Sequence, residues 1–133
     1  MNKSDFIYPV SVRFNDIDVF GHVNNAIYLS YFEEARMQLF NEVLGLKHDW
    51  IKQGLILAKA LLEYKSPLRL NETAFIKVHC SHVGNTSFTL FYTIYNSENQ
   101  KIYCTGETTI VMFDYSINKS IPVIDAIRKL NVV

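Results

Sequence analysis

The pattern of hydrophobic and polar positions predicts one long helix. From Ala26 to about Leu44 the polar residues fall on a narrow stripe, and the other positions are almost all apolar. A helix that is apolar over most of its circumference is normally covered by another element. Asn24 or Asn25 is a suitable N-cap, and Gly45 is a suitable C-cap. We therefore expect a buried central helix.

Alternating apolar and polar positions predict strands before and after this helix in the sequence. The first alternating segment runs from Tyr8 to Asn15. Gly106 lies inside the last segment and predicts a bulge or a close backbone approach. Later strands are expected over 55–65, 74–83, 88–95 and 102–113, with a helical turn over 47–53 and a short last helix capped by Ser120. One buried helix and about five antiparallel strands predict an α+β domain.

Length and composition agree with a single domain over residues 1–133. Hydrophobic residues make up 49% of the chain and charged residues 20%, which is typical of a folded globular protein. Thirteen basic and thirteen acidic residues balance, and this argues against nucleic-acid binding. Without a long apolar segment we expect a cytoplasmic protein that does not associate with membranes. Cys80 and Cys104 are expected to be buried free thiols, and no metal or cofactor is predicted.

The segment 13–28, between the first strand and the helix, contains the residue types of a functional site. Asp18 lies just before the helix, and Gly21 and His22 follow it. The N-terminus of a helix offers free N–H groups and a partial positive charge, which suit a carbonyl oxygen that gains negative charge during attack. Each of these residue types is also common in caps and turns, so only their spacing can distinguish a functional site from a structural turn.

The spacing Asp18-x-x-Gly21-x-Val-x-x-x-x-Tyr28, followed by an aromatic and acidic helix, resembles the 4-hydroxybenzoyl-CoA thioesterase family of hotdog-fold acyl-CoA thioesterases. Segments 63–68, 83–88 and 106–114 are similar to later parts of the same family, in the same order. The resemblance implies a hotdog fold, in which the sheet wraps around the central helix. It also implies a homodimer or homotetramer that hydrolyses an acyl-CoA to a carboxylic acid and CoA.

The resemblance assigns roles to individual residues. Asp18 would be the nucleophile or general base, and the backbone amide of Asn25 would stabilise the oxyanion. His22 would orient water or assist the leaving thiolate, although a structural role for it is equally compatible with its position. The implied substrate-binding residues are Gly21, Tyr28, Tyr31, Lys59, Lys65, Gly84, Asn85, Thr86 and Ser87.

The sequence also permits different residues and different functions. Asp16 competes with Asp18, because residues two apart in an extended segment point to the same side. Glu33 on the helix is another candidate base. Plant-type acyl-carrier-protein thioesterases are similar but have an asparagine where this chain has Phe20. A non-catalytic acyl-CoA-binding module and an enoyl-CoA hydratase also remain open, and the presence of Asp18 with Gly21 favours the hydrolase.

Overall fold

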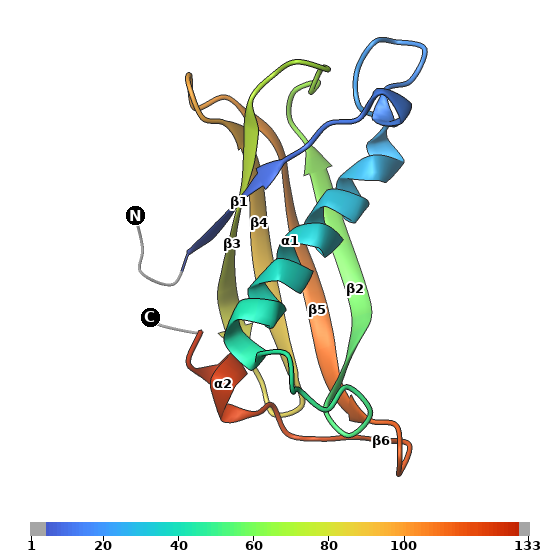
Figure 1. Ribbon diagram of the computed structural model, residues 1–133, viewed down its shortest axis with the longest axis vertical. Helices are drawn as coiled ribbons and strands as arrows, with labels where there is room; N and C mark the ends of the chain where they lie inside the picture. Colours follow the sequence, from blue (N-terminus) through green and yellow to red (C-terminus); the bar gives the residue numbers. More distant parts are fainter. Residues whose placement is uncertain (1–4, 131–133) are drawn as a thin grey trace.

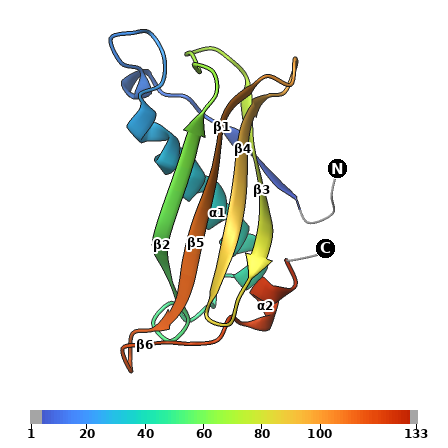
Figure 2. The same cartoon turned by 180° about the vertical axis from the view of Figure 1, so that it is seen from behind.

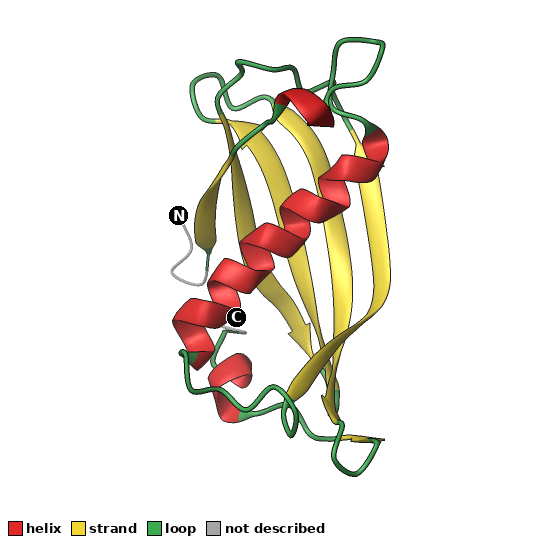
Figure 3. Ribbon diagram, turned by 45° about the vertical axis from the view of Figure 1, so that its right-hand side comes forward, coloured by secondary structure: helices red, strands yellow, loops and turns green. Residues whose placement is uncertain are grey.

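A computed structural model describes residues 5–130 of the chain. A curved antiparallel sheet packs its concave face on one long helix, α1 (Tyr28–Leu44) (Figure 1). The strands are β1 (Phe6–Val10), β2 (Gly54–Tyr64), β3 (Ala74–Val83), β4 (Ser87–Asn96), β5 (Ile102–Asp114) and β6 (Lys119–Ser120). Their spatial order is β1-β3-β4-β5-β2, with β6 beside β5, so that β1 and β2 form the two edges. This is the expected hotdog arrangement, and Figure 3 shows the helix lying across the sheet.

The long helix has the ends that the sequence predicts. A single 3-10 turn, η2 (Asn25–Ile27), leads into α1, and the Asn24 side chain accepts the Ala26 amide at 2.9 Å. Asn24 is therefore the N-cap. Gly45 ends the helix at a φ of 80°, a conformation that favours glycine. The residues of the polar stripe are all exposed: Ser30, Glu33, Glu34, Gln38, Asn41 and Glu42.

Gly106 allows the middle of α1 to approach the sheet closely. The Phe32 ring is fully buried and stacks on the Tyr92 ring, with 4.3 Å between the centroids. Tyr92 is paired with Gly106 across β4 and β5. A Cβ atom at Gly106 would collide with the Phe32 ring and would lie 2.9 Å from the Leu61 carbonyl oxygen. Of the two possibilities that the sequence left open, the close approach is the correct one.

Residues 47–53 contain the expected helical turn, in which the Gln53 amide donates to the Asp49 carbonyl at 2.9 Å. Two other local expectations are wrong. The first strand ends at Val10, because residues 14–16 form a 3-10 turn that the Asp16 carboxylate closes by accepting the Arg13 amide. Ser120 belongs to β6 and caps nothing. The last helix, α2 (Asp125–Arg128), begins later because the amides of residues 121 and 123 donate to carbonyls of the sheet and its hairpin.

The two ends of the sheet contact different ends of α1. β2 and β5 pair from Gly54–Phe113 at one end to Tyr64–Cys104 at the other. Tyr64 packs on Tyr28 at the start of the helix, whereas Phe88 packs on Phe40 near its end. The hairpin 84–87 therefore lies at the opposite end of the sheet from the helix N-terminus, as Figure 2 shows from behind.

Two further sequence observations can be compared with the structure. Cys80 and Cys104 are buried free thiols, as expected. Within residues 5–130, no helix is long and apolar enough to cross a membrane.

Candidate active site

Asp18 begins a tight turn that the backbone holds in place. Its amide donates to the His22 carbonyl at 3.0 Å, and its carbonyl accepts the Gly21 amide at 3.0 Å. Gly21 has a φ of +85° with open space around its Cα, so backbone conformation alone selects glycine here. Asp18 Oδ1 accepts the Phe20 amide at 2.9 Å. Oδ2 has no hydrogen bond among the described residues, and the partly exposed carboxylate remains available for chemistry.

A cleft of about 270 Å³ opens between the start of the helix and the end of β2. The hydroxyl of Tyr64 donates to the Asn25 carbonyl at 3.0 Å, and the Tyr64 and Tyr28 rings meet edge to face at 5.5 Å. These contacts tie the two elements together and shape the wall of the cleft. Its lining residues are His22, Asn25, Tyr28, Tyr64, Lys65, Ser66 and Pro67. Four of the predicted site residues therefore meet here: His22, Asn25, Tyr28 and Lys65.

The Asn25 amide has the properties of an oxyanion donor. The first N–H groups of a helix have no intrahelical acceptor. The Asn24 side chain occupies the N–H of Ala26, whereas the Asn25 amide donates to nothing within residues 5–130. Asn25 is exposed and lies on the cleft wall. The partial positive charge of the helix N-terminus adds to the attraction for a developing negative charge.

Asp16, the competitor of Asp18, is held inside the protein. It is 2% exposed and accepts the Arg13 amide at 3.0 Å and the Tyr31 hydroxyl at 2.7 Å. Burial raises the pKa of Asp16, but these hydrogen bonds and the Arg13 charge outweigh it, so that the pKa lies below its usual value. The two acidic residues therefore have different surroundings, and only Asp18 is accessible.

Tyr31 is committed to the same buried contact. It is 4% exposed and is not among the residues that line the cleft. Burial, followed by the hydrogen bond to Asp16, raises the pKa of the Tyr31 hydroxyl far above its usual value. Tyr28 is also buried but faces the cleft, and burial raises the pKa of its hydroxyl to about 12. Of the two predicted tyrosines, Tyr28 alone lines this cleft.

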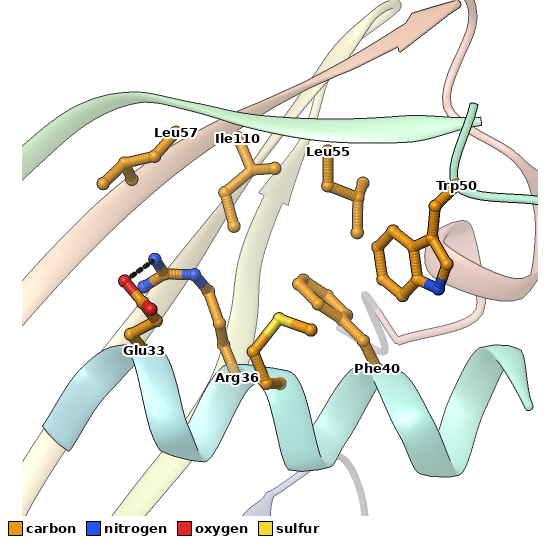
Figure 4. A pocket seen from close by; sticks show the side chains of 8 residues that line it. Glu33, Arg36, Phe40, Trp50, Leu55, Leu57 and Ile110 are labelled. Carbon is orange, nitrogen blue, oxygen red and sulfur yellow. Dashed lines mark ion pairs between the residues drawn. The ribbon is translucent and has the colours of Figure 1, made fainter. Parts of the chain in front are cut away.

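The remaining predicted residues are not among those that line this cleft in the single chain. Asp18 and Gly21 belong to the turn that ends at His22, and of these three only His22 lines the cleft. Lys59 is exposed on the edge strand β2. The carbonyl oxygens of Gly84 and Asn85 accept hydrogen bonds from the Arg128 guanidinium, at the other end of the sheet. Thr86 and Ser87 belong to the same hairpin. Glu33 is exposed and borders a different cavity, together with Arg36 (Figure 4).

Sequence reasoning missed two groups of residues. Tyr64, Ser66 and Pro67 line the cleft, although the sequence indicates for segment 63–68 only a similarity to a later part of the family. Arg36 is buried against the sheet, and a signal for it existed: it lies four residues after Phe32, on the apolar side of the helix. A charged residue at such a position is a candidate for function.

Comparisons with known proteins find relatives over most of the chain. A family model described as the thioesterase-like superfamily matches residues 12–130. The acyl-CoA thioester hydrolase YbgC of Escherichia coli O6:H1 is 30% identical over 107 residues, which cover 74% of this chain and 75% of that protein. A Thermus thermophilus thioesterase, solved in complex with coenzyme A and Zn, is 30% identical with a TM-score of 0.79, covering 92% of this chain and 88% of that one. The chloroplastic acyl-acyl carrier protein thioesterase ATL3 of Arabidopsis thaliana is 27% identical over 117 residues, or 86% of this chain and 60% of that protein.

Proposed function

Because this chain belongs to the thioesterase-like superfamily, it is a thioester hydrolase, and we propose that it cleaves acyl-CoA in the cleft beside Asp18. One observation carries the proposal. Asn25, whose amide has no acceptor among residues 5–130, lines one cleft together with His22 and Tyr28, and the backbone of His22 is hydrogen-bonded to Asp18.

Asp18 is proposed to start the attack on the thioester. As a general base, its carboxylate takes a proton from water while the water oxygen bonds to the acyl carbon. As a nucleophile, it bonds to the acyl carbon itself and forms an anhydride that water then cleaves. In both routes the carbon–sulfur bond breaks, and CoA leaves as a thiolate that takes up a proton. His22 on the cleft wall is the proposed source of that proton or the group that orients the water.

The Asn25 amide is the proposed oxyanion donor. In well-studied hydrolases the loss of one such donor costs about 2.7–4 kcal/mol of transition-state stabilisation. Because this donor is a backbone group at a capped helix end, its position depends on Asn24 and on the Tyr64 hydrogen bond. Lys65 on the cleft rim supplies positive charge for the phosphates of CoA, although its ammonium group also lies 3.0 Å from Glu63.

We also propose that the active form is a homodimer joined through β2. This edge strand pairs on one side only and exposes Leu57, Leu61 and Tyr64 by 39–48%. An exposed, partly apolar edge is a template for pairing with another strand. Antiparallel pairing of two β2 strands would bring the Gly54 end of one copy, with its hairpin 84–87, to the Tyr64 end of the other. The predicted contacts of the hairpin and of Lys59 with CoA then come from the second copy. Light scattering during gel filtration tests the dimer, and a monomeric mass at micromolar concentration refutes it.

The decisive experiment measures CoA release with the variant Asp18→Asn. The panel contains short, long and aromatic acyl-CoAs, including 4-hydroxybenzoyl-CoA, and one acyl-carrier-protein thioester. We expect kcat to fall by roughly 10²–10⁴, the usual contribution of a general base. The amide keeps an oxygen for the Phe20 N–H, so the turn is expected to survive.

Asp114→Asn is the matched control. Asp114 also accepts the amide two residues later, that of Ser116, but it is not among the residues that line the cleft. This variant is expected to retain wild-type activity. Asp18→Asn activity equal to that of wild type would refute the mechanism. If wild type and Asp18→Asn both bind acyl-CoA and neither releases CoA, the result would support the non-catalytic module instead.

A further inference from the structure

A crossover loop, residues 65–73, connects β2 at one edge of the sheet to β3 and passes the ends of β5 and β4 (Figure 1). Its first part, residues 65–67, lines the cleft. The next residue, Leu68, is completely buried, and its carbonyl accepts the Val23 amide at 2.8 Å. The crossover loop therefore forms one wall of the cleft and also contacts the segment that carries Asp18.

The hydrogen bond from Val23 to Leu68 anchors the turn of Asp18. The other backbone hydrogen bonds of residues 17–23 join positions at most four apart in the chain. Within the described part of the chain, the Val23 bond is the one that ties this turn to a distant segment. Val23 is 1% exposed, so water cannot easily replace the Leu68 carbonyl. The position of the turn therefore depends on where the crossover loop holds Leu68.

One residue of β5, Tyr103, holds the crossover loop at both ends. At the start of the loop, the Tyr103 carbonyl accepts the amides of Lys65 at 2.8 Å and Ser66 at 3.1 Å. At the far end, the Tyr103 hydroxyl donates to the Glu72 carboxylate. Asn96, the last residue of β4, donates to the same hydroxyl at 3.0 Å and so orients it. Tyr103 is completely buried and Asn96 is 8% exposed, so these contacts are shielded from water.

A β-bulge places the Tyr103 side chain in this position. Across β4 and β5, Ile94 is paired with Cys104 and Tyr95 with Ile102, so Tyr103 is left without a partner on β4. Successive residues of a regular strand face opposite sides of the sheet, but Tyr103 and Cys104 are both completely buried. A bulge turns a side chain in a new direction, and bulges are common next to active sites. The bulge thus accounts for a buried hydroxyl that reaches the crossover loop.

We propose that Tyr103 is a positioning residue for the Asp18 turn. Its hydroxyl holds the far end of the crossover loop, and the loop carries the acceptor that anchors the turn. The inference rests on the proposed function, because the turn matters for catalysis only if Asp18 starts the attack. The Asp18 carboxylate and the Asn25 amide must meet the same acyl group, and a misplacement of about 1 Å can cost roughly 10²-fold in rate.

The variant Tyr103→Phe removes only the hydroxyl and keeps the ring and the backbone carbonyl. The start of the crossover loop, with cleft residues 65–67, therefore stays in place, whereas its far end loses the bond to Glu72. We expect kcat for acyl-CoA to fall by about 10- to 100-fold, with KM changed by less than about twofold. Wild-type kcat in a folded Tyr103→Phe variant, or a change confined to KM, would overturn the proposal.

Variants of Glu72 test whether the hydrogen bond itself is responsible. Glu72→Gln keeps an oxygen that accepts from Tyr103, so its kcat should stay within about threefold of wild type. Glu72→Ala removes the acceptor and should lower kcat as far as Tyr103→Phe does. Because both residues act through one bond, the double variant should lose no more activity than either single variant. Losses that multiply in the double variant, or wild-type kcat in Glu72→Ala, would contradict the proposal.

Hydrogen exchange of the Val23 amide, followed by NMR, reports on the anchor without an enzymatic assay. In Tyr103→Phe this exchange should become about tenfold faster or more, because movement of the crossover loop breaks the bond to Leu68. Ile127→Val is the control for lost stability, since it removes a methylene group from a completely buried side chain in α2. This control should lower the melting temperature and leave kcat and the Val23 exchange rate unchanged.

The exchange measurement also separates the two proposals. Equal exchange of the Val23 amide in wild type and Tyr103→Phe would overturn the positioning role, whatever the activity. If wild type cleaves no thioester, the proposed function fails, and the exchange rate still decides whether Tyr103 holds the turn.

Discussion

The buried contact between Asp16 and Tyr31 allows a quantitative test of why one of two neighbouring acidic residues is structural. Tyr31→Phe removes only the hydroxyl that donates to Asp16 Oδ2 at 2.7 Å, and it leaves the ring in place. Hydrogen bonds to charged groups contribute about 1.5–3 kcal/mol. Because Asp16 is 2% exposed, water cannot easily replace the lost donor. We expect the free energy of unfolding to fall by about 1.5–3 kcal/mol at pH 7.

The loss should depend on pH in a defined direction. The pKa of Asp16 in the folded protein lies below the value of 3.8 expected without its partners, so its contribution to stability is fully present above that value. The contribution disappears as the pH falls through the lower, folded-state pKa. Removal of the Tyr31 hydroxyl raises the folded-state pKa toward 3.8. The difference between wild type and Tyr31→Phe should therefore be largest above pH 5 and should shrink toward pH 3.

Urea unfolding followed by circular dichroism from pH 3 to 7, at one protein concentration, provides the measurement. Tyr64→Phe is the matched control, because its hydroxyl also makes one hydrogen bond but is exposed and meets a neutral carbonyl. Its cost is expected to stay below about 1 kcal/mol and to be independent of pH over this range. A Tyr31→Phe cost no larger than that of the control, or equal at pH 3 and pH 7, would refute the structural role assigned to Asp16.

Three local contacts give further predictions. Gly106→Ala forces a methyl group against the Phe32 ring, and thermal unfolding should show a loss of about 1–3 kcal/mol; a melting temperature equal to that of wild type would contradict the close approach. Asn24→Ala removes the cap on the Ala26 amide and should cost about 0.5–2 kcal/mol in urea unfolding, together with a lower kcat, whereas unchanged kcat would separate the cap from the active site. Burial raises the pKa of the Cys104 thiol to about 12, so iodoacetamide at pH 8 should label it only after unfolding. Labelling of Cys104 in the folded protein, detected by mass spectrometry, would contradict this prediction.

Local sequence patterns were sufficient to predict the elements of the fold. Caps and periodicity act within a few residues, so Asn24, Gly45 and the exposed polar stripe could be recognised from neighbouring positions. The same holds for the strands, whose alternation reflects two faces with different surroundings. The errors at Phe14 and Ser120 arose where a side-chain contact or a bond to the sheet ended an otherwise regular pattern.

The sequence by itself determined that a glycine turn, an acidic residue and a capped helix would lie next to one another, because all of them fall within one short segment. Only the tertiary structure decided which groups face the cleft. Asp16 and Asp18 are two residues apart, but the Tyr31 hydroxyl of α1 donates to the buried Asp16 carboxylate and not to Asp18. Arg36 likewise becomes buried only when β2 and β5 pack against α1. Burial and pairing depend on contacts between residues far apart in the chain, and a local pattern does not contain them.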